Sequence, residues 1–273
     1  MVPDTAPTVK IVVLARGLGS RMREDTGVPL TEEQRRAAAA GVKAMMPVGR
    51  PFLDHCLSTY ADAGFREACL VIGPEHRAIR DYYGSQPMSR ITVTFAEQAE
   101  PRGTADAVLA AEDFVGGDRF VVVNGDNFYT AATLQTLRAT PGNAVVGYDR
   151  SGLVEMSNVP AERVHAFALI AAGPDGQVRD IVEKPSPEQA DMLGPDARVS
   201  MNCFAFTPEI FAAARRISPS PRGELEITDA VRTLITDGAG VRLVPVYDGV
   251  LDLSRRDDVS SVTRALAGHE VRL

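Results

Sequence analysis

Short apolar runs rich in β-branched residues recur along the first half of the chain, separated by amphipathic stretches. The runs predict strands buried on both faces of a sheet, at 11–14, 68–72, 91–95 and 120–123. The stretches between them predict helices at 51–63, 75–83 and 103–114. Strands and helices that alternate in this rhythm indicate an α/β fold with a doubly wound, mainly parallel sheet and right-handed crossovers.

The pattern changes from about Asn143 onward. Further strands are predicted at 144–148, 164–171, 178–183, 199–206, 241–246 and 250–253, with helices at 208–217, 224–237 and 257–267. We expect these strands to form a mixed or antiparallel extension of the same sheet. Because no Pro/Ser-rich linker divides the two halves, we expect one domain over residues 1–273.

Composition and charge narrow the class of protein. The formal net charge of −7, without a basic stripe, argues against nucleic acid as a partner. No apolar run approaches a membrane span, and residues 1–8 lack the apolar core of a signal peptide, so we expect a cytoplasmic protein with no membrane partner. Three scattered cysteines, Cys56, Cys69 and Cys203, do not suit a disulfide framework or a zinc site.

A glycine loop follows the first predicted strand. Gly17 and Gly19 can adopt positive φ and bring backbone N–H groups close to a ligand. Such a loop after a buried strand can hold phosphate oxygens. Ser20 adds a hydroxyl, and Arg21 adds a planar cation that suits a polyphosphate. The segment is therefore a candidate phosphate-binding loop.

Two better-known phosphate loops do not match this segment. The dinucleotide fingerprint requires a third glycine, but Met22 stands in its place. The P-loop requires a Gly-Lys-Ser/Thr triplet, which the chain lacks. The missing glycine and the lack of an early ribose-binding acid also disfavour a nicotinamide-dependent dehydrogenase.

Two more polar clusters follow predicted strands. Glu97 and Gln98 come after one strand, and Gly125 and Asp126 come after another. In doubly wound sheets, ligands bind beyond the carboxyl ends of the strands, so we expect these clusters and the glycine loop to meet. By itself, an acid such as Asp126 is typical either of a metal ligand or of a helix cap.

A polar insertion separates the glycine loop from Lys43. Within it, Thr31 and Gly41 bound a predicted helix at 32–40, which we interpret as an exposed surface helix. A lid over the loop and an oligomer contact are alternatives. Taken alone, Lys43 ahead of an apolar segment has the pattern of a surface residue.

Together these segments resemble the sugar-1-phosphate nucleotidyltransferases, above all the enzymes that make dTDP-, UDP- or ADP-glucose. Eight segments in the family's order carry the resemblance: Leu-Ala-Arg-Gly-Leu-Gly-Ser-Arg-Met at 14–22, Lys43 before Met-Pro-Val at 46–48, Glu-Gln at 97–98 with Gly-Thr-Ala-Asp-Ala-Val at 103–108, Gly-Asp-Asn at 125–127, Glu-Lys-Pro at 183–185, Met-Asn-Cys-Phe at 201–204, Gly-Glu-Leu-Glu-Ile-Thr-Asp at 223–229, and Asp-Leu at 252–253.

The resemblance implies a Rossmann-like, GT-A-like fold with a nucleotide-binding half at about 9–127, a sugar-phosphate-binding half at about 128–255 and a C-terminal helix at 257–267. It implies catalytic roles for Arg21, Lys43 and Lys184. Nucleotide contacts are implied for Leu14, Ala15, Gly17, Gly19, Ser20, Gln98, Gly103, Thr104 and Asp126. Contacts to the sugar phosphate are implied for Asn127, Glu183, Lys184, Asn202 and Glu224. The implied ligands of Mg²⁺ are Asp126 and Asp252.

The implied reaction is attack of a sugar-1-phosphate, or of a similar cyclitol phosphate, on the α-phosphorus of a nucleoside triphosphate. The alternative is a catalytically silent relative that senses nucleotides. The segment at 103–108 is more like the adenylyl branch and the segment at 17–22 more like the uridylyl branch, so the base stays open. Arg16 stands where many relatives have a small residue, which predicts an extra cation in the loop or a side chain that points outward. Relatives built as a bare catalytic domain lead us to expect a homo-oligomer, a dimer or tetramer.

Overall fold

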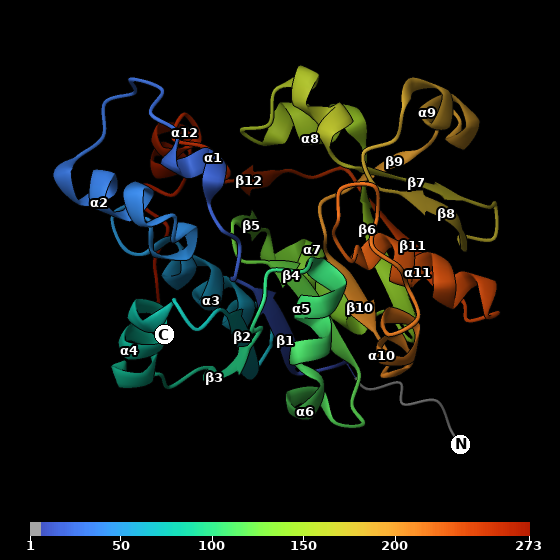
Figure 1. Ribbon diagram of the computed structural model, residues 1–273, viewed down its shortest axis with the longest axis horizontal. Helices are drawn as coiled ribbons and strands as arrows, with labels where there is room; N and C mark the ends of the chain where they lie inside the picture. The colour runs from blue at the N-terminus through green and yellow to red at the C-terminus, as the bar shows by residue number, and fades with distance from the viewer. Residues whose placement is uncertain (1–6) are drawn as a thin grey trace.

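The computed structural model describes residues 7–273; residues 1–6, which hold most of the segment examined for a leader, lie outside it. Four parallel strands form the first half of a central sheet, in the order β3-β2-β1-β4. They are β1 (Lys10–Leu14), β2 (Glu67–Ile72), β3 (Thr92–Glu97) and β4 (Phe120–Asn124). The prediction of a doubly wound, mainly parallel sheet for this half is confirmed (Figure 1).

The same sheet continues through the second half of the chain. Beyond β4 the order is β10-β6-β9-β7-β8, with antiparallel pairing at each step, and β11 pairs parallel to β6. These strands are β6 (Asn143–Tyr148), β7 (Ala168–Ala172), β8 (Val178–Val182), β9 (Arg198–Ser200), β10 (Phe204–Phe206) and β11 (Val241–Val246). The predicted mixed extension of one sheet is therefore confirmed. A separate ribbon joins β5 (Asn127–Tyr129) to β12 (Val250–Asp252).

Helices cover both faces of the sheet, because central strands such as β1 have apolar side chains on both faces. Ile11 and Val13 face one hydrophobic core while Val12 faces the other, and all three side chains are fully buried. The first core is covered by α3 (Phe52–Asp62), α4 (Arg77–Ser85), α7 (Ala131–Ala139) and α12 (Asp258–Ala265). The second is covered by α5 (Thr104–Ala110), α6 (Glu112–Val115), α10 (Glu209–Ala214) and α11 (Ile227–Thr236). No helix within residues 7–273 is long and apolar enough to span a membrane.

Several predicted element boundaries are wrong, in each case because of a contact with residues that are distant in the sequence. The strand predicted at 164–171 begins only at Ala168, because the 3₁₀ turn η2 (Ala161–Ala166) directs Arg163 away from the sheet to Asp252 and Asp258. The helix predicted at 224–237 begins only at Ile227, because Leu225 pairs through its backbone with the segment before α5.

Two predicted elements are each split in two. The strand predicted at 199–206 is interrupted at Asn202, whose φ of 53° leaves the extended region. The helix predicted at 103–114 breaks at Ala111, which caps both α5 and α6. The pattern did not reveal β5 or the short helical elements α1 (Ser20–Arg23), η1 (Lys43–Met45), α8 (Arg150–Met156) and α9 (Pro187–Leu193).

The insertion packs against the C-terminal part of the chain. Its helix α2 (Glu32–Ala40) has a capping box at Thr31 and ends at Gly41 in the left-handed conformation, as predicted. Before that helix, Asp25 forms an ion pair with Arg256, whose guanidinium also donates to the carbonyl oxygen of Met22. The insertion, which was considered for an oligomer contact, is thus joined to the segment directly before α12 within one chain.

A histidine pair joins the C-terminal segment to α3, and Figure 1 places the C-terminus beside α4. Nδ1 of His269 lies 3.1 Å from Nδ1 of His55, and the ring of His269 meets the edge of Phe128 in β5. Burial lowers the pKa of both histidines, and for His55 the neighbouring His269 adds to the effect. The carboxylates of Asp54 and Asp62 oppose this lowering.

We predict that stability falls on acidification below pH 6.5, the ordinary histidine value. In that range the unfolded chain takes up protons that the buried pair does not, so the free energy of unfolding decreases as pH falls through the lowered pKa values. Denaturant unfolding between pH 7.5 and 5.5 measures this slope. His269→Asn should make it shallower, whereas His165→Asn, at an exposed position, should leave it unchanged. An equal slope in the wild type and His269→Asn would contradict the prediction.

Candidate active site

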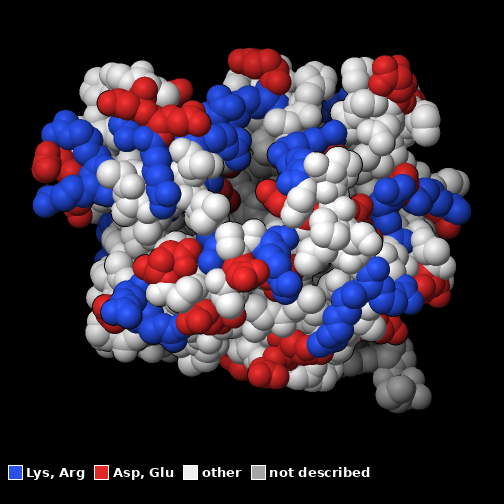
Figure 2. Space-filling model, in the orientation of Figure 1, with Lys and Arg blue, Asp and Glu red and all other residues white. Residues whose placement is uncertain are grey.

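Two polar cavities of about 340 and 320 Å³ lie side by side beyond the carboxyl ends of β1, β3 and β4. The first, here called the nucleotide cavity, is lined by the glycine loop, Lys43 and Gln98. The second, here called the acceptor cavity, is lined by Lys184, Asn202 and Asp252. Both cavities are lined by Arg21, Thr104, Asn124, Asp126 and Glu224. Figure 2 shows a hollow in the upper middle of the molecule, with Lys and Arg atoms along its upper and right-hand rim.

The glycine loop is held by the end of α2. Gly19 has a φ of 62°, and a Cβ on it would lie 2.2 Å from the carbonyl oxygen of Gly41, so no side chain fits there. Gly17 differs from the expectation, because its φ is not positive and a Cβ would meet open space. Leu14, Ala15, Gly17, Gly19 and Ser20 all line the nucleotide cavity. The insertion therefore serves as a support for the loop.

Arg16 points into the protein, so the prediction of an outward side chain is wrong. Its Nε donates to the carbonyl oxygen of Gln98 at 2.7 Å, and Nη2 donates to that of Ala99 at 3.1 Å. Nη2 also lies 3.5 Å from Glu75. Arg16 thus ties the glycine loop to the loop after β3 through Nε and Nη2, while its Nη1 is buried and has no hydrogen-bond partner among the described residues.

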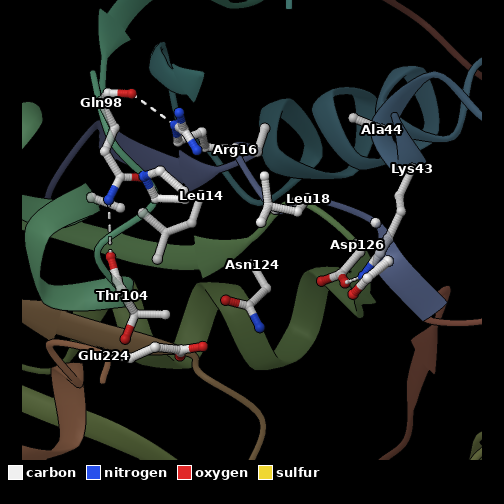
Figure 3. Close-up of a pocket in the computed structure, with 18 of the residues that line it drawn as sticks. Leu14, Arg16, Leu18, Lys43, Ala44, Gln98, Thr104, Asn124, Asp126 and Glu224 are labelled. Atoms are coloured by element: carbon white, nitrogen blue, oxygen red, sulfur yellow. Dashed lines mark hydrogen bonds and ion pairs between the residues drawn. The ribbon is translucent and has the colours of Figure 1, made fainter. Parts of the chain in front are cut away.

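The end of the nucleotide cavity that contains Gln98 is formed where the segment before α5 joins the segment before α11. Gly103 has a φ of 125°, and a Cβ there would lie 2.5 Å from the backbone of Leu225. Thr104 accepts a hydrogen bond from the N–H of Ile227 at 2.9 Å, which brings Glu224 beside it. Figure 3 shows Gln98 and Arg16 at one end of the cavity and Lys43 with Asp126 at the other.

Two acids meet between the cavities because β5 and β12 pair beneath them. The N–H of Leu253 donates to the carbonyl oxygen of Asp126, which places Asp252 next to Asp126. Nζ of Lys43 lies 2.7 Å from Oδ2 of Asp126. Asn127, predicted to bind the sugar phosphate, is buried and donates to Oδ1 of Asp252 at 3.1 Å.

Burial, together with the charge of Asp126, raises the pKa of Asp252 to about 6. Two neighbouring carboxylates of this kind fit Mg²⁺, a hard ion that binds a few protein oxygens together with phosphate oxygens and water. Within residues 7–273 no group of three or more His, Cys, Asp or Glu side chains is placed to hold a metal ion. Asp126 and Asp252 are thus the candidate protein ligands.

The acceptor cavity contains two strained residues. Lys184 and Asn202, with φ of 43° and 53°, are the only non-glycine residues with positive φ between residues 7 and 273. Such strain is concentrated at binding sites, where the surrounding structure holds it. Lys184 is exposed and forms no ion pair with the described residues, so its charge is available to an anion. Burial raises the pKa of the adjacent Glu183, and Glu226 adds to the effect.

Sequence reasoning missed three arginines of the acceptor cavity, Arg163, Arg222 and Arg255. Arg163 forms ion pairs with Asp252 and with Asp258, the latter at 2.8 Å. Arg222 lies 2.6 Å from Glu226 and 3.7 Å from Glu183. Arg222 directly precedes a segment already recognised at 223–229, which was an available signal. Arg163 had none, because it lies in a stretch predicted as a strand.

The family model for nucleotidyl transferases matches residues 10–246. The chain belongs to this family. Among curated relatives, it is 29% identical over 251 residues to the UTP–glucose-1-phosphate uridylyltransferase AglF of Haloferax volcanii, covering 92% of this chain and 93% of that protein. It is 30% identical to a glucose-1-phosphate thymidylyltransferase of Streptomyces griseus, where the match spans 94% of this chain but 65% of the relative. The prediction of a nucleotidyltransferase is confirmed at the level of the family.

Solved structures confirm the fold of this family member. A UDP-glucose pyrophosphorylase complexed with UDP-glucose matches with a TM-score of 0.74 and 19% identity, covering 96% of this chain and 99% of that one. A UDP-glucose pyrophosphorylase from Acinetobacter baumanii matches with a TM-score of 0.69 and 18% identity, covering 94% of this chain and 92% of that one. The expected GT-A-like nucleotidyltransferase fold is thereby confirmed.

Proposed function

We propose that this family member transfers a nucleotidyl group from a nucleoside triphosphate to a sugar-1-phosphate, or to a similar cyclitol phosphate, and releases pyrophosphate. The observation that carries the proposal is the pair of adjoining cavities with a shared boundary at Arg21 and Asp126. A transfer between two phosphates needs both substrates in line at one point, and little covalent chemistry from the protein. The curated relatives described above bear names of such transferases.

In this proposal the glycine loop positions the triphosphate, and Arg21 neutralises the charge of the leaving pyrophosphate. Arg21 is exposed and forms no ion pair with the described residues, so its donors are available. Lys43, held beside Asp126, adds a second cation at the same end of the cavity. Lys184 holds the phosphate of the acceptor from the other side. Glu183 and Asn202 then face the sugar hydroxyls, with Glu224 between the two substrates.

Asp126 and Asp252 would hold Mg²⁺, which supplies charge neutralisation at the reacting phosphates. Asn127 orients Asp252 from behind through its side-chain amide. Arg163 neutralises Asp252 from the opposite side. These contacts keep two like charges close together, where a divalent cation can bind both.

The test is release of pyrophosphate in mixtures of purified protein, nucleoside triphosphate, glucose-1-phosphate and Mg²⁺. The proposal expects release only when all components are present. A nucleotide-sensing relative would bind the nucleotide without releasing pyrophosphate under any combination. The same panel, repeated with other hexose phosphates and cyclitol phosphates, identifies the acceptor.

We further propose that the protein works in the cytoplasm as a homo-oligomer. All the candidate site residues come from a single chain, so assembly would not be needed to complete the site. Light scattering at working concentration distinguishes a monomer from a dimer or tetramer.

A further inference from the structure

The short helix α1 carries Arg21, and its own sequence gives it little stability. It has only four residues, so its last carbonyl oxygens find no hydrogen-bond partner within the helix. No side chain caps its first turn. A helix of this length is unstable by itself. The position of Arg21 therefore depends on contacts that hold α1 from outside.

Arg256 supplies hydrogen bonds at the end of α1, which Figure 1 shows beside α12. Its Nε donates to the carbonyl oxygen of Met22 at 3.0 Å, and its Nη2 donates to that of Arg23 at 3.1 Å. Its Nη1 lies 3.0 Å from Oδ1 of Asp25. The side chain of Arg256 is only 11% exposed, so water competes weakly for the guanidinium. All three nitrogens of the guanidinium thus hold the last turn of α1 and the residues that follow it.

The turn that carries Arg256 is joined to the candidate metal ligand Asp252. Oδ2 of the buried Asp258 accepts hydrogen bonds from the N–H groups of Ser254 at 2.9 Å and of Arg255 at 2.7 Å. Oγ of Ser254 in turn donates to Oδ1 of Asp252 at 2.7 Å. A series of hydrogen bonds through this turn therefore connects Asp252 with α1.

We propose that Arg256 is a positioning residue for nucleotidyl transfer: by binding the end of α1, it sets the place of Arg21 relative to Asp252. The inference rests on the proposed function, in which Arg21 neutralises the leaving pyrophosphate and Asp252 holds the metal ion. Both groups have to meet the same triphosphate, although more than 230 positions separate their segments along the chain. A misplacement of about 1 Å at a reacting centre can lower a rate roughly 10²-fold, so a contact that aligns the two segments contributes to turnover.

The two carbonyl contacts of Arg256 carry this role, and its ion pair with Asp25 does not. The side chain of Asp25 is 79% exposed. An ion pair with a partner so open to solvent contributes little, because water and salt screen it. The carbonyl oxygens of Met22 and Arg23, in contrast, belong to α1 itself.

The test is a double-mutant cycle between Arg256 and Arg21. Arg256→Ala should lower kcat/KM for the triphosphate about tenfold, measured by release of pyrophosphate. In the Arg21→Ala background the same change should lower it less than about twofold, because the residue that Arg256 positions is absent. A tenfold loss in both backgrounds would overturn the proposal, and so would wild-type kinetics of either single variant.

Arg256→Lys separates geometry from charge. Lysine keeps the positive charge but has one nitrogen in place of the planar fork that reaches both carbonyl oxygens. It should therefore lose about as much as Arg256→Ala, roughly tenfold. Wild-type kinetics of Arg256→Lys would show that a nearby charge suffices, against the proposal. Asp25→Asn should change kcat/KM less than about twofold, and a loss equal to that of Arg256→Ala would assign the effect to the ion pair instead.

The matched control is Arg264→Ala, which removes an exposed arginine of α12 and should keep wild-type kinetics. Thermal unfolding of each variant shows whether it folds. If neither Arg256→Ala nor Arg256→Lys folds, the guanidinium serves the fold as a whole and the proposal fails.

Failure of the proposed function would be recognised separately. If the wild type releases no pyrophosphate with any acceptor, transfer is refuted, and the same cycle is measured by calorimetry as the affinity for UTP, dTTP, GTP or ATP with Mg²⁺, whichever binds most tightly. A loss for Arg256→Ala that disappears in the Arg21→Ala background would still show that Arg256 positions Arg21 at the triphosphate. Equal losses in both backgrounds, or no loss in either, would refute the positioning role as well.

Discussion

Replacing Asp126 or Asp252 with asparagine is expected to remove nearly all nucleotidyl transfer. Asp126 directly precedes β5, and Asp252 ends β12, the strand that pairs with β5; in the proposed function both carboxylates hold one divalent cation at the reacting phosphates. Loss of a group that stabilises developing charge typically lowers turnover by roughly 10²–10³-fold, and we expect at least that loss for each variant. Turnover with saturating Mg²⁺ and both substrates measures it.

A control removes a nearby acid that touches neither cavity. Glu162 is exposed and directly precedes Arg163, so Glu162→Gln should turn over like the wild type. Calorimetry of Mg²⁺ in the presence of nucleotide gives a second readout, in which both aspartate variants should bind the ion more weakly. Turnover near the wild-type rate for Asp252→Asn would remove this residue from the metal site.

Lys184→Ala is expected to raise the KM for the sugar phosphate, whereas Arg21→Ala is expected to impair use of the triphosphate. Lys184 lines only the acceptor cavity, while Arg21 lies in the short helix α1 (Ser20–Arg23), directly after the glycine loop, and lines both cavities. A charge-assisted hydrogen bond contributes about 1.5–3 kcal/mol, so each loss should be on the order of ten- to a hundredfold in kcat/KM for the affected substrate. Steady-state kinetics with one substrate varied at a time separates the two effects.

The backbone at Lys184 requires its own control. Lys184 has a φ of 43°, a conformation that glycine adopts without strain. Lys184→Gly should therefore lose as much acceptor affinity as Lys184→Ala, because both remove the charge. A glycine variant with normal KM would show that the strained backbone, and not the ammonium group, holds the acceptor. If Lys184→Ala changed nucleotide affinity alone, the roles of the two residues would be reversed.

The central strands could be predicted because their burial leaves a continuous apolar run. Ile11, Val12 and Val13 face two cores in alternation, so each position requires an apolar side chain. The polar residues that follow such strands, including Gln98 and Asp126, then meet at one edge of the sheet. The location of the site therefore followed from local patterns.

The direction of individual side chains did not follow from local patterns. Arg16 points inward because carbonyl groups of the loop after β3 accept its hydrogen bonds. These carbonyl groups lie more than 80 positions away along the chain, so the sequence near Arg16 does not indicate them. Arg163 leaves a predicted strand because Asp252 and Asp258 lie opposite it, about ninety positions along the chain. The orientation of the Gln98 amide depends on Asp106 and Gly103, which only the folded loop brings to the same nitrogen.

The most direct test of the central claim follows the phosphorus atoms of the nucleotide. The protein would be incubated with glucose-1-phosphate, Mg²⁺ and the preferred triphosphate, labelled in parallel at the α- or the γ-phosphate. Transfer of a nucleotidyl group predicts that the α-label appears in a nucleoside diphosphate sugar and the γ-label in pyrophosphate, in equal amounts. Release of the γ-label as inorganic phosphate, or recovery of both labels in unchanged nucleotide with every acceptor tested, would contradict the account.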